Sequence, residues 1–224
     1  MLLNAMHIKR SISVRNHSYQ VEVPDACPIC HRHSEIQVVG ADVIDDGKAV
    51  QAIFRCAYTG CRQHFFCYYG PITSGVLVSV RPVKPVLSAF PAAVSTISPT
   101  FLSVFAEAEE AAQLGLNQIA GPGYRKAFEY LIKDYAKSIS PERASEIEAK
   151  FAGAVVNDFV ADPRIQAVAK RSLWLGNDET HYLRKWSDHD VSDLVTLIKL
   201  AANWIEIDHL SKSYVESMPE PKGA

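Results

Sequence analysis

The stretches Cys27-Pro-Ile-Cys30 and Cys56-Ala-Tyr-Thr-Gly-Cys61 decide how the first third of the chain folds. Each stretch can form a knuckle that presents two sulfurs to one metal ion, and four thiolates can close a tetrahedron around Zn²⁺. Cysteine also serves as a small buried apolar residue, but unrelated cysteines rarely fall as two tight pairs with Pro inside one and Gly inside the other. We therefore predict one Zn²⁺ held by Cys27, Cys30, Cys56 and Cys61.

Nearby histidines offer an alternative ligand, because the second cysteine pair is wider than the usual two-residue gap. His31, His33 or His64 could replace one sulfur, although each is better explained as a surface histidine or one that supports a ligand. Cys67 is the odd cysteine. It lies in the alternating run Phe65–Tyr69, so we predict a buried thiol on a strand.

Between and around the cysteine pairs, the sequence alternates as strands do. Residues 36–44 and 49–56 are predicted strands joined by a turn at Asp45-Asp46-Gly47, which gives the order knuckle, strand, turn, strand, knuckle of a zinc ribbon. Further strands are expected around residues 19–23, 65–69 and 76–80. Residues 1–80 are therefore interpreted as a zinc-ribbon β domain.

The rest of the chain is predicted to be helical. Residues 81–99 hold four prolines and are interpreted as a Pro-rich linker or surface strap. Residues 100–216 are expected to form a helical bundle, and residues 217–224 a tail. The predicted fold class is α+β, an N-terminal β zinc ribbon followed by an all-α bundle.

Capping patterns place the helix ends. Helices are expected to start at Ser98-Pro99, Ser140-Pro141 and Asp162-Pro163. A second helix should follow the glycine loop at residues 121–123, with an apolar stripe that includes Tyr130, and that loop is a weak candidate for anion binding. The helix that starts at Pro163 should end at Gly176, and the last helix should be capped by Ser187.

Charge and hydropathy exclude several classes of protein. The net charge is −2, so no global basic field attracts nucleic acid, and any such contact needs a local patch. No stretch reaches the length of a transmembrane helix, and Met1–Arg10 lacks the apolar core of a signal peptide. Five cysteines without a secretion signal favour a reducing compartment. We expect a cytoplasmic protein with no membrane association.

Two polar clusters in the helical part could carry chemistry. Asn177 and His181 are four residues apart and would share one face of a helix. The alternative is that Asn177 caps a helix and His181 is an ordinary loop histidine. Arg125 and Glu129 are also spaced i,i+4 and can simply pair on the helix surface.

A cysteine ribbon, the stretch Tyr-Arg125-Lys-Ala-Phe-Glu129-Tyr-Leu-Ile-Lys and the stretch Leu-Gly176-Asn177-Asp-Glu-Thr-His181 precede a long final helix. This pattern resembles the domain-of-unknown-function 4145 family over most of residues 20–210. That family occurs alone in bacteria and fused to restriction-enzyme subunits. Its helical part is similar to the HEPN superfamily, whose bundles include many RNases of toxin and antiviral systems. The resemblance implies a HEPN-like bundle and a homodimer.

The active HEPN signature is an Arg, a polar residue, three further residues and a His. The resemblance makes Asn177 and His181 the candidate catalytic residues, but Gly176 stands at the Arg position. Without that Arg, charge on a phosphate transition state would be unmatched. Arg171 or Arg184 could compensate, although neither holds the motif position. Arg125, Glu129, Arg171 and Arg184 are the candidate binding residues.

Three functions follow. The first is a zinc-binding, non-catalytic nucleic-acid-associated (RNA or DNA) or adaptor protein, in a bacterial defence or restriction-linked system. The second is a metal-independent endoribonuclease that uses His181 as general acid or base. The third is a structural dimerisation scaffold for a protein partner. The missing Arg favours the first and third functions.

We also expect Asn177 and His181 to line a cleft near Arg125 and Glu129. His181 would lie either in a binding site there or, preferably, in a clasp between the helix that starts at Pro163 and the last helix.

Overall fold

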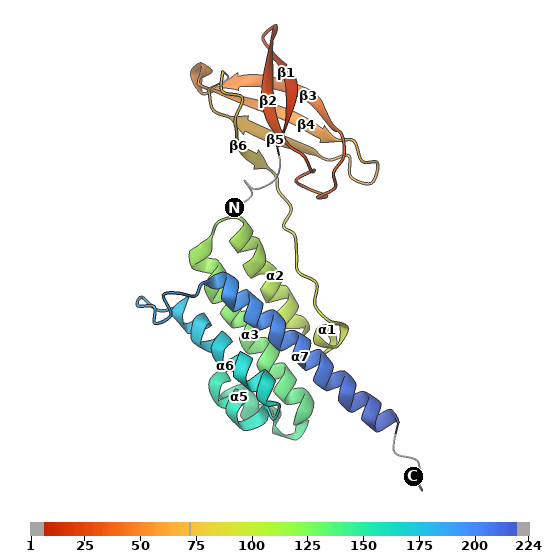
Figure 1. Ribbon diagram of the computed structural model, residues 1–224, viewed down its shortest axis with the longest axis vertical. Helices are drawn as coiled ribbons and strands as arrows, with labels where there is room; N and C mark the ends of the chain where they lie inside the picture. The colour runs from red at the N-terminus through yellow and green to blue at the C-terminus, as the bar shows by residue number, and fades with distance from the viewer. Residues whose placement is uncertain (1–6, 72, 219–224) are drawn as a thin grey trace. The chain divides into compact units, whose positions relative to one another are not determined.

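The computed structural model describes residues 7–71 and 73–218 and divides the chain into two compact units, Met1–Val86 and Leu87–Ala224 (Figure 1). In the described residues the first unit contains antiparallel β-sheets and the second contains seven α-helices. The predicted α+β fold class is confirmed at this level.

The first unit consists of a two-stranded hairpin and a four-stranded antiparallel sheet of order β3-β4-β5-β6. The strands are β1 (His7–Val14), β2 (His17–Pro24), β3 (Ile36–Ile44), β4 (Ala49–Cys56), β5 (His64–Tyr69) and β6 (Leu77–Arg81). The predicted strands at 36–44 and 49–56 are confirmed. They are joined by a short 3-10 turn (Asp45–Gly47), in which Gly47 takes a φ of 92° that favours glycine.

Alternation along β4 builds the core of this unit. Val50, Ala52, Phe54 and Cys56 are buried, whereas the residues between them are half-buried. The apolar residues of β1 and β2 join the same cluster, with Ile12 and the strand residues Val14, Val21 and Val23 buried. The hairpin therefore covers one face of the sheet.

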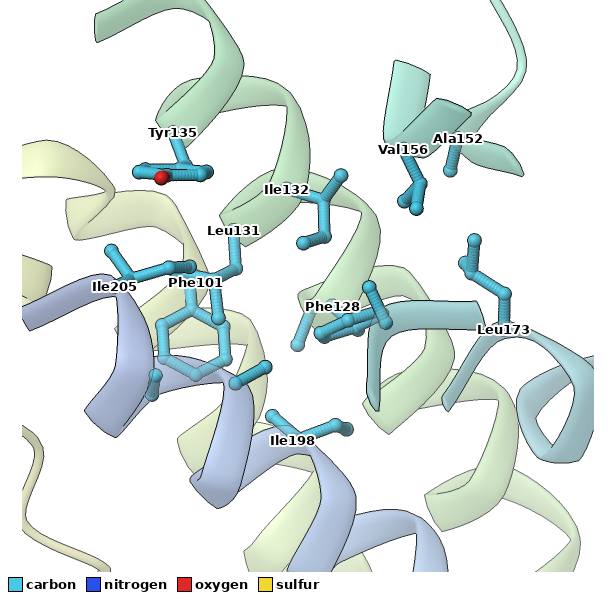
Figure 2. Packing of buried hydrophobic residues seen from close by; sticks show 14 of the residues in the cluster. Phe101, Phe128, Leu131, Ile132, Tyr135, Ala152, Val156, Leu173, Ile198 and Ile205 are labelled. Atoms are coloured by element: carbon cyan, nitrogen blue, oxygen red, sulfur yellow. The ribbon is translucent and has the colours of Figure 1, made fainter. Parts of the chain in front are cut away.

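The second unit is a bundle around one long helix. Its helices are α1 (Ala92–Ile97), α2 (Pro99–Gln113), α3 (Asn117–Ile139), α4 (Ala144–Ala149), α5 (Ala152–Phe159), α6 (Pro163–Asp178) and α7 (Val191–Ser217), with a 3-10 turn (Pro141–Arg143) before α4. Helix α3 contacts α2, α5, α6 and α7. Figure 2 shows the resulting core, in which Phe128 and Ile132 of α3 meet side chains of the surrounding helices.

The segment predicted as a linker differs in the structure. Residues 92–97 form helix α1, and Val94 is fully buried in the bundle core. The Ala93 N–H donates to Glu206 of α7 at 2.8 Å, and Ser98 Oγ donates to Asp134 of α3 at 2.6 Å. The apolar residues between the prolines thus pack as part of the bundle, because removing their apolar surface from water lowers the free energy of the folded chain.

The predicted glycine loop is wrong. Helix α3 begins at Asn117 and runs through residues 121–123, so that stretch offers no helix N-terminus to an anion. The two glycines instead allow close packing. A Cβ atom at Gly121 would lie 2.7 Å from Glu179 Cβ, and one at Gly123 would lie 2.9 Å from Ala108 Cβ. Tyr130 is also not part of the buried stripe, because its side chain is exposed.

Two further helix ends differ from prediction. Helix α6 continues through Gly176 to Asp178. Helix α7 is capped by Asp190, not Ser187. The Asp190 side chain accepts from the backbone N–H groups of Ser192 and Asp193, and the Asp193 side chain accepts from the backbone N–H of Asp190. This reciprocal capping box satisfies N–H groups that have no partner inside the helix.

Candidate functional site

The four predicted cysteines come together in the first unit. The Sγ atoms of Cys27, Cys30, Cys56 and Cys61 all lie within 4.8 Å of one another. The Sγ atoms of Cys27 and Cys61 are 4.0 Å apart, and those of Cys30 and Cys56 are 3.9 Å apart. None of these sulfurs is in a disulfide. Four thiol ligands at this spacing could hold a metal ion.

The second cysteine of each pair, Cys30 or Cys61, lies in the same kind of turn. In the first, the His31 N–H donates to the Cys27 carbonyl at 2.9 Å. In the second, the Cys61 and Arg62 N–H groups donate to the Tyr58 carbonyl at 2.9 and 3.0 Å. His31 and Arg62, which directly follow the second cysteine of each pair, both have left-handed φ values, of 58° and 51°. The first turn thus contains both of its cysteines, whereas the second contains only Cys61, and Cys56 is the last residue of β4.

Hydrogen bonds and burial act in opposite directions on the thiols. At Cys56, burial raises the pKa, but bonds from Ser34 Oγ, at 3.2 Å, and from the Tyr58 N–H outweigh it, so the pKa falls to about 7. At Cys27, burial raises the pKa to about 12. Metal ligands must be thiolates, so binding of a cation here releases protons.

The nearby histidines are not part of the cluster. The His33 side chain is 77% exposed and lies 3.4 Å from Asp25, and His31 and His64 are exposed. Cys67 lies on β5 with no exposed surface, as predicted for a buried thiol, and burial raises its pKa to about 12. Among the described residues, the four cysteines are the only group of this kind with metal-ligand spacing.

In the second unit, α3 and α6 bring three of the predicted residues together. Arg125 Nε donates to Asn177 Oδ1 at 2.9 Å, and Arg125 Nη1 lies 3.7 Å from the Glu129 carboxylate. Lys133 also pairs with Glu129, at 2.9 Å. Arg125, Glu129 and Asn177 line a hollow of about 640 Å³. Asn177 is therefore a bonded side chain within the last turn of α6, and the helix cap is Glu179.

His181 lies beyond the end of α6. It lines a neighbouring hollow of about 520 Å³ that shares Asn177 and Trp174 with the first. Its backbone N–H donates to the Asn177 carbonyl at 3.1 Å. Its side chain is exposed and forms no hydrogen bond within the part of the chain that the structure describes. The expected clasp through His181 is therefore wrong.

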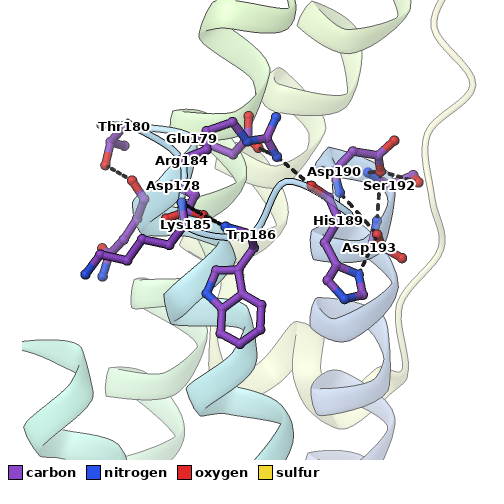
Figure 3. A network of polar contacts seen from close by, with 11 residues as sticks. Asp178, Glu179, Thr180, Arg184, Lys185, Trp186, His189, Asp190, Ser192 and Asp193 are labelled. Atoms are coloured by element: carbon purple, nitrogen blue, oxygen red, sulfur yellow. Dashed lines mark hydrogen bonds and ion pairs between the residues drawn. The ribbon is translucent and has the colours of Figure 1, made fainter. Parts of the chain in front are cut away.

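Asp178, and not His181, is the side chain that joins the end of α6 to a neighbouring segment. Its side chain is buried, and Oδ2 accepts from the backbone N–H groups of Lys185 and Trp186 at 2.8 and 2.7 Å (Figure 3). It thus ties the loop of residues 179–190 to the end of α6. Sequence reasoning missed this residue, because an Asp within a polar run carries no local sign that it will be buried.

The other candidate residues lie apart from this cluster. Arg171 is exposed, donates to the Ala167 carbonyl of its own helix at 2.9 Å and lines a third hollow. Arg184 pairs with Glu179 at 2.9 Å and donates to the His189 carbonyl at 2.6 Å. Both contacts of Arg184 hold the loop of residues 179–190 (Figure 3).

Gly176 lies under the side chain of Arg125. A Cβ atom at residue 176 would lie 2.8 Å from Arg125 Cγ and 3.0 Å from Arg125 Cβ. A side chain at residue 176 would therefore overlap the near end of the Arg125 side chain, which comes from α3.

No protein-family model, curated protein or solved structure matches the chain. Among the described residues, no helix is long and apolar enough to cross a membrane.

Proposed function

We propose that this is a zinc-binding, non-catalytic nucleic-acid-associated protein, with one Zn²⁺ held by Cys27, Cys30, Cys56 and Cys61. The sulfur spacing carries the zinc assignment. A tetrahedron with Zn–S bonds of about 2.3 Å has edges of about 3.8 Å. Two of the six sulfur pairs are 4.0 and 3.9 Å apart, and all six lie within 4.8 Å. The ion would join the two knuckles and stabilise a ribbon whose own core is small.

Elemental analysis tests the metal. Protein purified without chelator should contain one zinc per chain. Protein that contains no metal, or that contains iron with the absorption of a sulfur-ligated iron centre, would contradict the assignment.

The nucleic-acid association is supported by charge on the bundle. Lys170, Arg171 and Lys185 each line one of the hollows beside α6, and none of them pairs with a carboxylate in the described part of the chain. Unpaired cations on one surface form the local patch that an acidic protein needs in order to bind phosphates. The resemblance to the domain-of-unknown-function 4145 family and to HEPN-like bundles points to the same partner, in a defence or restriction-linked system.

Binding and cleavage of labelled RNA and DNA test this function. We expect binding that weakens steeply as salt rises, and no cleavage by the wild-type protein, because Gly176 replaces the signature arginine. Absence of binding to either polymer at low salt would contradict the association.

A second candidate, the metal-independent endoribonuclease, is favoured by one observation. The Arg125 guanidinium lies beside Asn177, so a positive charge is supplied to this region from α3. In that case RNA would be cleaved by the wild-type protein, and both Arg125→Ala and His181→Ala would abolish cleavage.

We further propose that the protein forms a homodimer through α7. In α7, Ile207, Leu210 and Tyr214 recur at spacings of three and four residues and are 44–64% exposed. The C-terminal part of α7 extends past the other helices of its unit (Figure 1). Such a stripe matches the seam of paired helices, and a second copy carries the same stripe.

A further inference from the structure

Two tryptophans lie stacked on the surface of the bundle. The rings of Trp174, in α6, and Trp186, in the loop before α7, are nearly parallel, with an interplanar angle of 6° and centroids 6.0 Å apart. Their side chains are 46% and 42% exposed. Large aromatic rings normally bury most of their area, so a paired set left in water marks an interaction surface.

The position of the pair is held by the surrounding bonds. The backbone N–H groups of Lys185 and Trp186 donate to the buried Asp178 carboxylate, which fixes the backbone of the loop beneath the Trp186 side chain (Figure 3). The ring of His189 lies 6.3 Å from that of Trp186, and His189 is itself 3.1 Å from Asp193. The stacking of the two indole rings and the contact of His189 with Trp186 position the rings before a ligand arrives, which lowers the entropy lost on binding.

The tryptophans form walls shared by neighbouring hollows. Trp174 lines all three hollows beside α6, and Trp186 lines two of them. The third hollow has a volume of about 370 Å³. Its apolar lining is Trp174, Leu175, Trp186 and Leu197, and its polar lining is Arg171, His189, Asp193 and Thr196. Its volume falls in the range of sites that bind small planar molecules.

The charges around the pair favour an anion. Each carboxylate that lines the three hollows is already engaged: Glu129 by Arg125 and Lys133, Asp178 by two backbone N–H groups, and Asp193 by the helix cap and His189. The cations Arg171 and Lys185, in contrast, pair with no carboxylate within the described residues. The lining of the three hollows thus holds four cations, Arg125, Lys170, Arg171 and Lys185, and three carboxylates, beside the two indole rings.

We propose that the Trp174–Trp186 pair is a stacking platform for the unpaired bases of single-stranded nucleic acid, with Arg171 and Lys185 contacting its phosphates. This inference rests on the proposed nucleic-acid association and names its substrate class. A base offers a planar face to an indole ring whatever its sequence, whereas the bases of a duplex are already stacked on one another. The fully exposed Tyr182, which lines the second hollow, could extend the platform.

Fluorescence anisotropy with labelled oligonucleotides tests the platform. Wild-type protein should bind single-stranded RNA or DNA more tightly than a duplex of the same sequence. Trp174→Ala and Trp186→Ala should each weaken single-strand binding about tenfold to hundredfold. Trp174→Phe should retain part of the affinity, because a smaller ring still stacks. Trp204→Phe is the matched control, since Trp204 lines none of the three hollows and packs against Arg164.

Lys185→Ala should weaken binding and lower the dependence of affinity on salt, because one phosphate contact is removed. Thermal melting of each variant checks that it is folded. Trp174→Ala is the decisive variant, because Trp174 lies within helix α6, where alanine keeps the backbone conformation, whereas Trp186 lies in a loop.

The outcomes separate this inference from the function on which it rests. If both tryptophan variants bind oligonucleotides as tightly as the wild type, the platform is overturned and the nucleic-acid association still holds. The same conclusion follows if the wild-type protein binds duplex and single strand equally tightly. Absence of any nucleic-acid binding by the wild-type protein overturns both. The tryptophan variants could instead change the molecular mass of the protein in light scattering and leave oligonucleotide binding unaffected. That result would show that a second copy of the chain covers these rings, and it also overturns the platform.

Discussion

The side chain of Arg125 lies across Gly176, so that a Cβ atom at residue 176 would come within 2.8 Å of Arg125 Cγ. The guanidinium then reaches Asn177, where Nε donates to Oδ1 at 2.9 Å. Helices α3 and α6 therefore meet at a point where only a glycine fits beneath an arginine. A larger residue at position 176 would have to displace the Arg125 side chain and so disturb its bond to Asn177.

Gly176→Ala should destabilise the bundle by about 1–3 kcal/mol, because the methyl group overlaps the near end of the Arg125 side chain. Gly153→Ala is the matched control, since it lies in helix α5 with nothing within 4 Å of its Cβ position, and it should stabilise by about 0.5–1 kcal/mol. Denaturant unfolding measures both. In an Arg125→Ala background the cost of Gly176→Ala should fall, because Cγ is removed and only the Cβ contact at 3.0 Å remains; an unchanged cost would show that Arg125 Cγ is not the obstacle.

Cys56→Ser should remove the metal and unfold the first unit while the bundle stays folded. Structural zinc contributes on the order of 10 kcal/mol to the folding of small modules, and the two units have separate cores. Limited proteolysis followed by mass spectrometry should yield a resistant fragment of the second unit. Cys67→Ala, which removes a buried thiol outside the cluster, should keep one zinc per chain; loss of zinc in this control as well would contradict a site of four ligands.

Asp178→Ala should cost about 1–3 kcal/mol of unfolding free energy, because the N–H groups of Lys185 and Trp186 lose their acceptor. His181→Ala should change stability by less than about 0.5 kcal/mol, because the side chain is exposed and bonded to nothing in the described residues. Thermal unfolding compares the two. If His181→Ala lowers the stability more than Asp178→Ala does, the predicted role of His181 as a clasp would be supported instead.

Asp162 should make the bundle sensitive to acid. The Arg164 guanidinium, bonded at 2.7 Å, and the N–H groups of Arg164 and Ile165 lower the pKa of Asp162 from 3.8 to about 2. Because the folded-state pKa lies below the unfolded value, this stabilisation is present above pH 3.8 and is lost as pH falls toward 2. Asp162→Asn keeps a capping side chain but removes the charge.

This variant should be less stable than wild type by about 0.5–1 kcal/mol at pH 7, and the difference should shrink between pH 4 and pH 2. Unfolding in denaturant across that range measures the effect. Asp188→Asn is the control, because Asp188 is exposed and forms no ion pair within the described residues. A difference independent of pH would contradict the role of charge.

The double variant Leu210→Glu/Tyr214→Glu should separate the proposed dimer into monomers, because two charges replace apolar side chains at the seam. Light scattering should give a mass of about twice 24.8 kDa for the wild type and near 24.8 kDa for the variant. His209→Glu, on the other side of the same helix turn, should leave the dimer intact. A wild-type protein that is monomeric at high concentration would overturn this proposal.

Local sequence was sufficient for the cysteine cluster and most of the β-strands. The ligands come in tight pairs, and the strands between them show a period of two, so short-range spacing determines which residues meet. Helix starts with Pro at the first position were predictable for the same reason at residues 99 and 163. Each cysteine pair, strand and helix start is signalled within a few residues, and the two cysteine pairs are brought together by the strands β3 and β4 between them.

Only the tertiary structure decided the polar surface of the bundle. Arg125 and Asn177 are 52 residues apart in the chain, and their contact depends on how α3 packs against α6. The burial of Asp178, the stacking of Trp174 on Trp186 and the packing of α1 onto the bundle depend on the same long-range contacts. Spacing along a chain predicts which face of an element is apolar, whereas the partner that covers a polar side chain is set by the packing of whole helices.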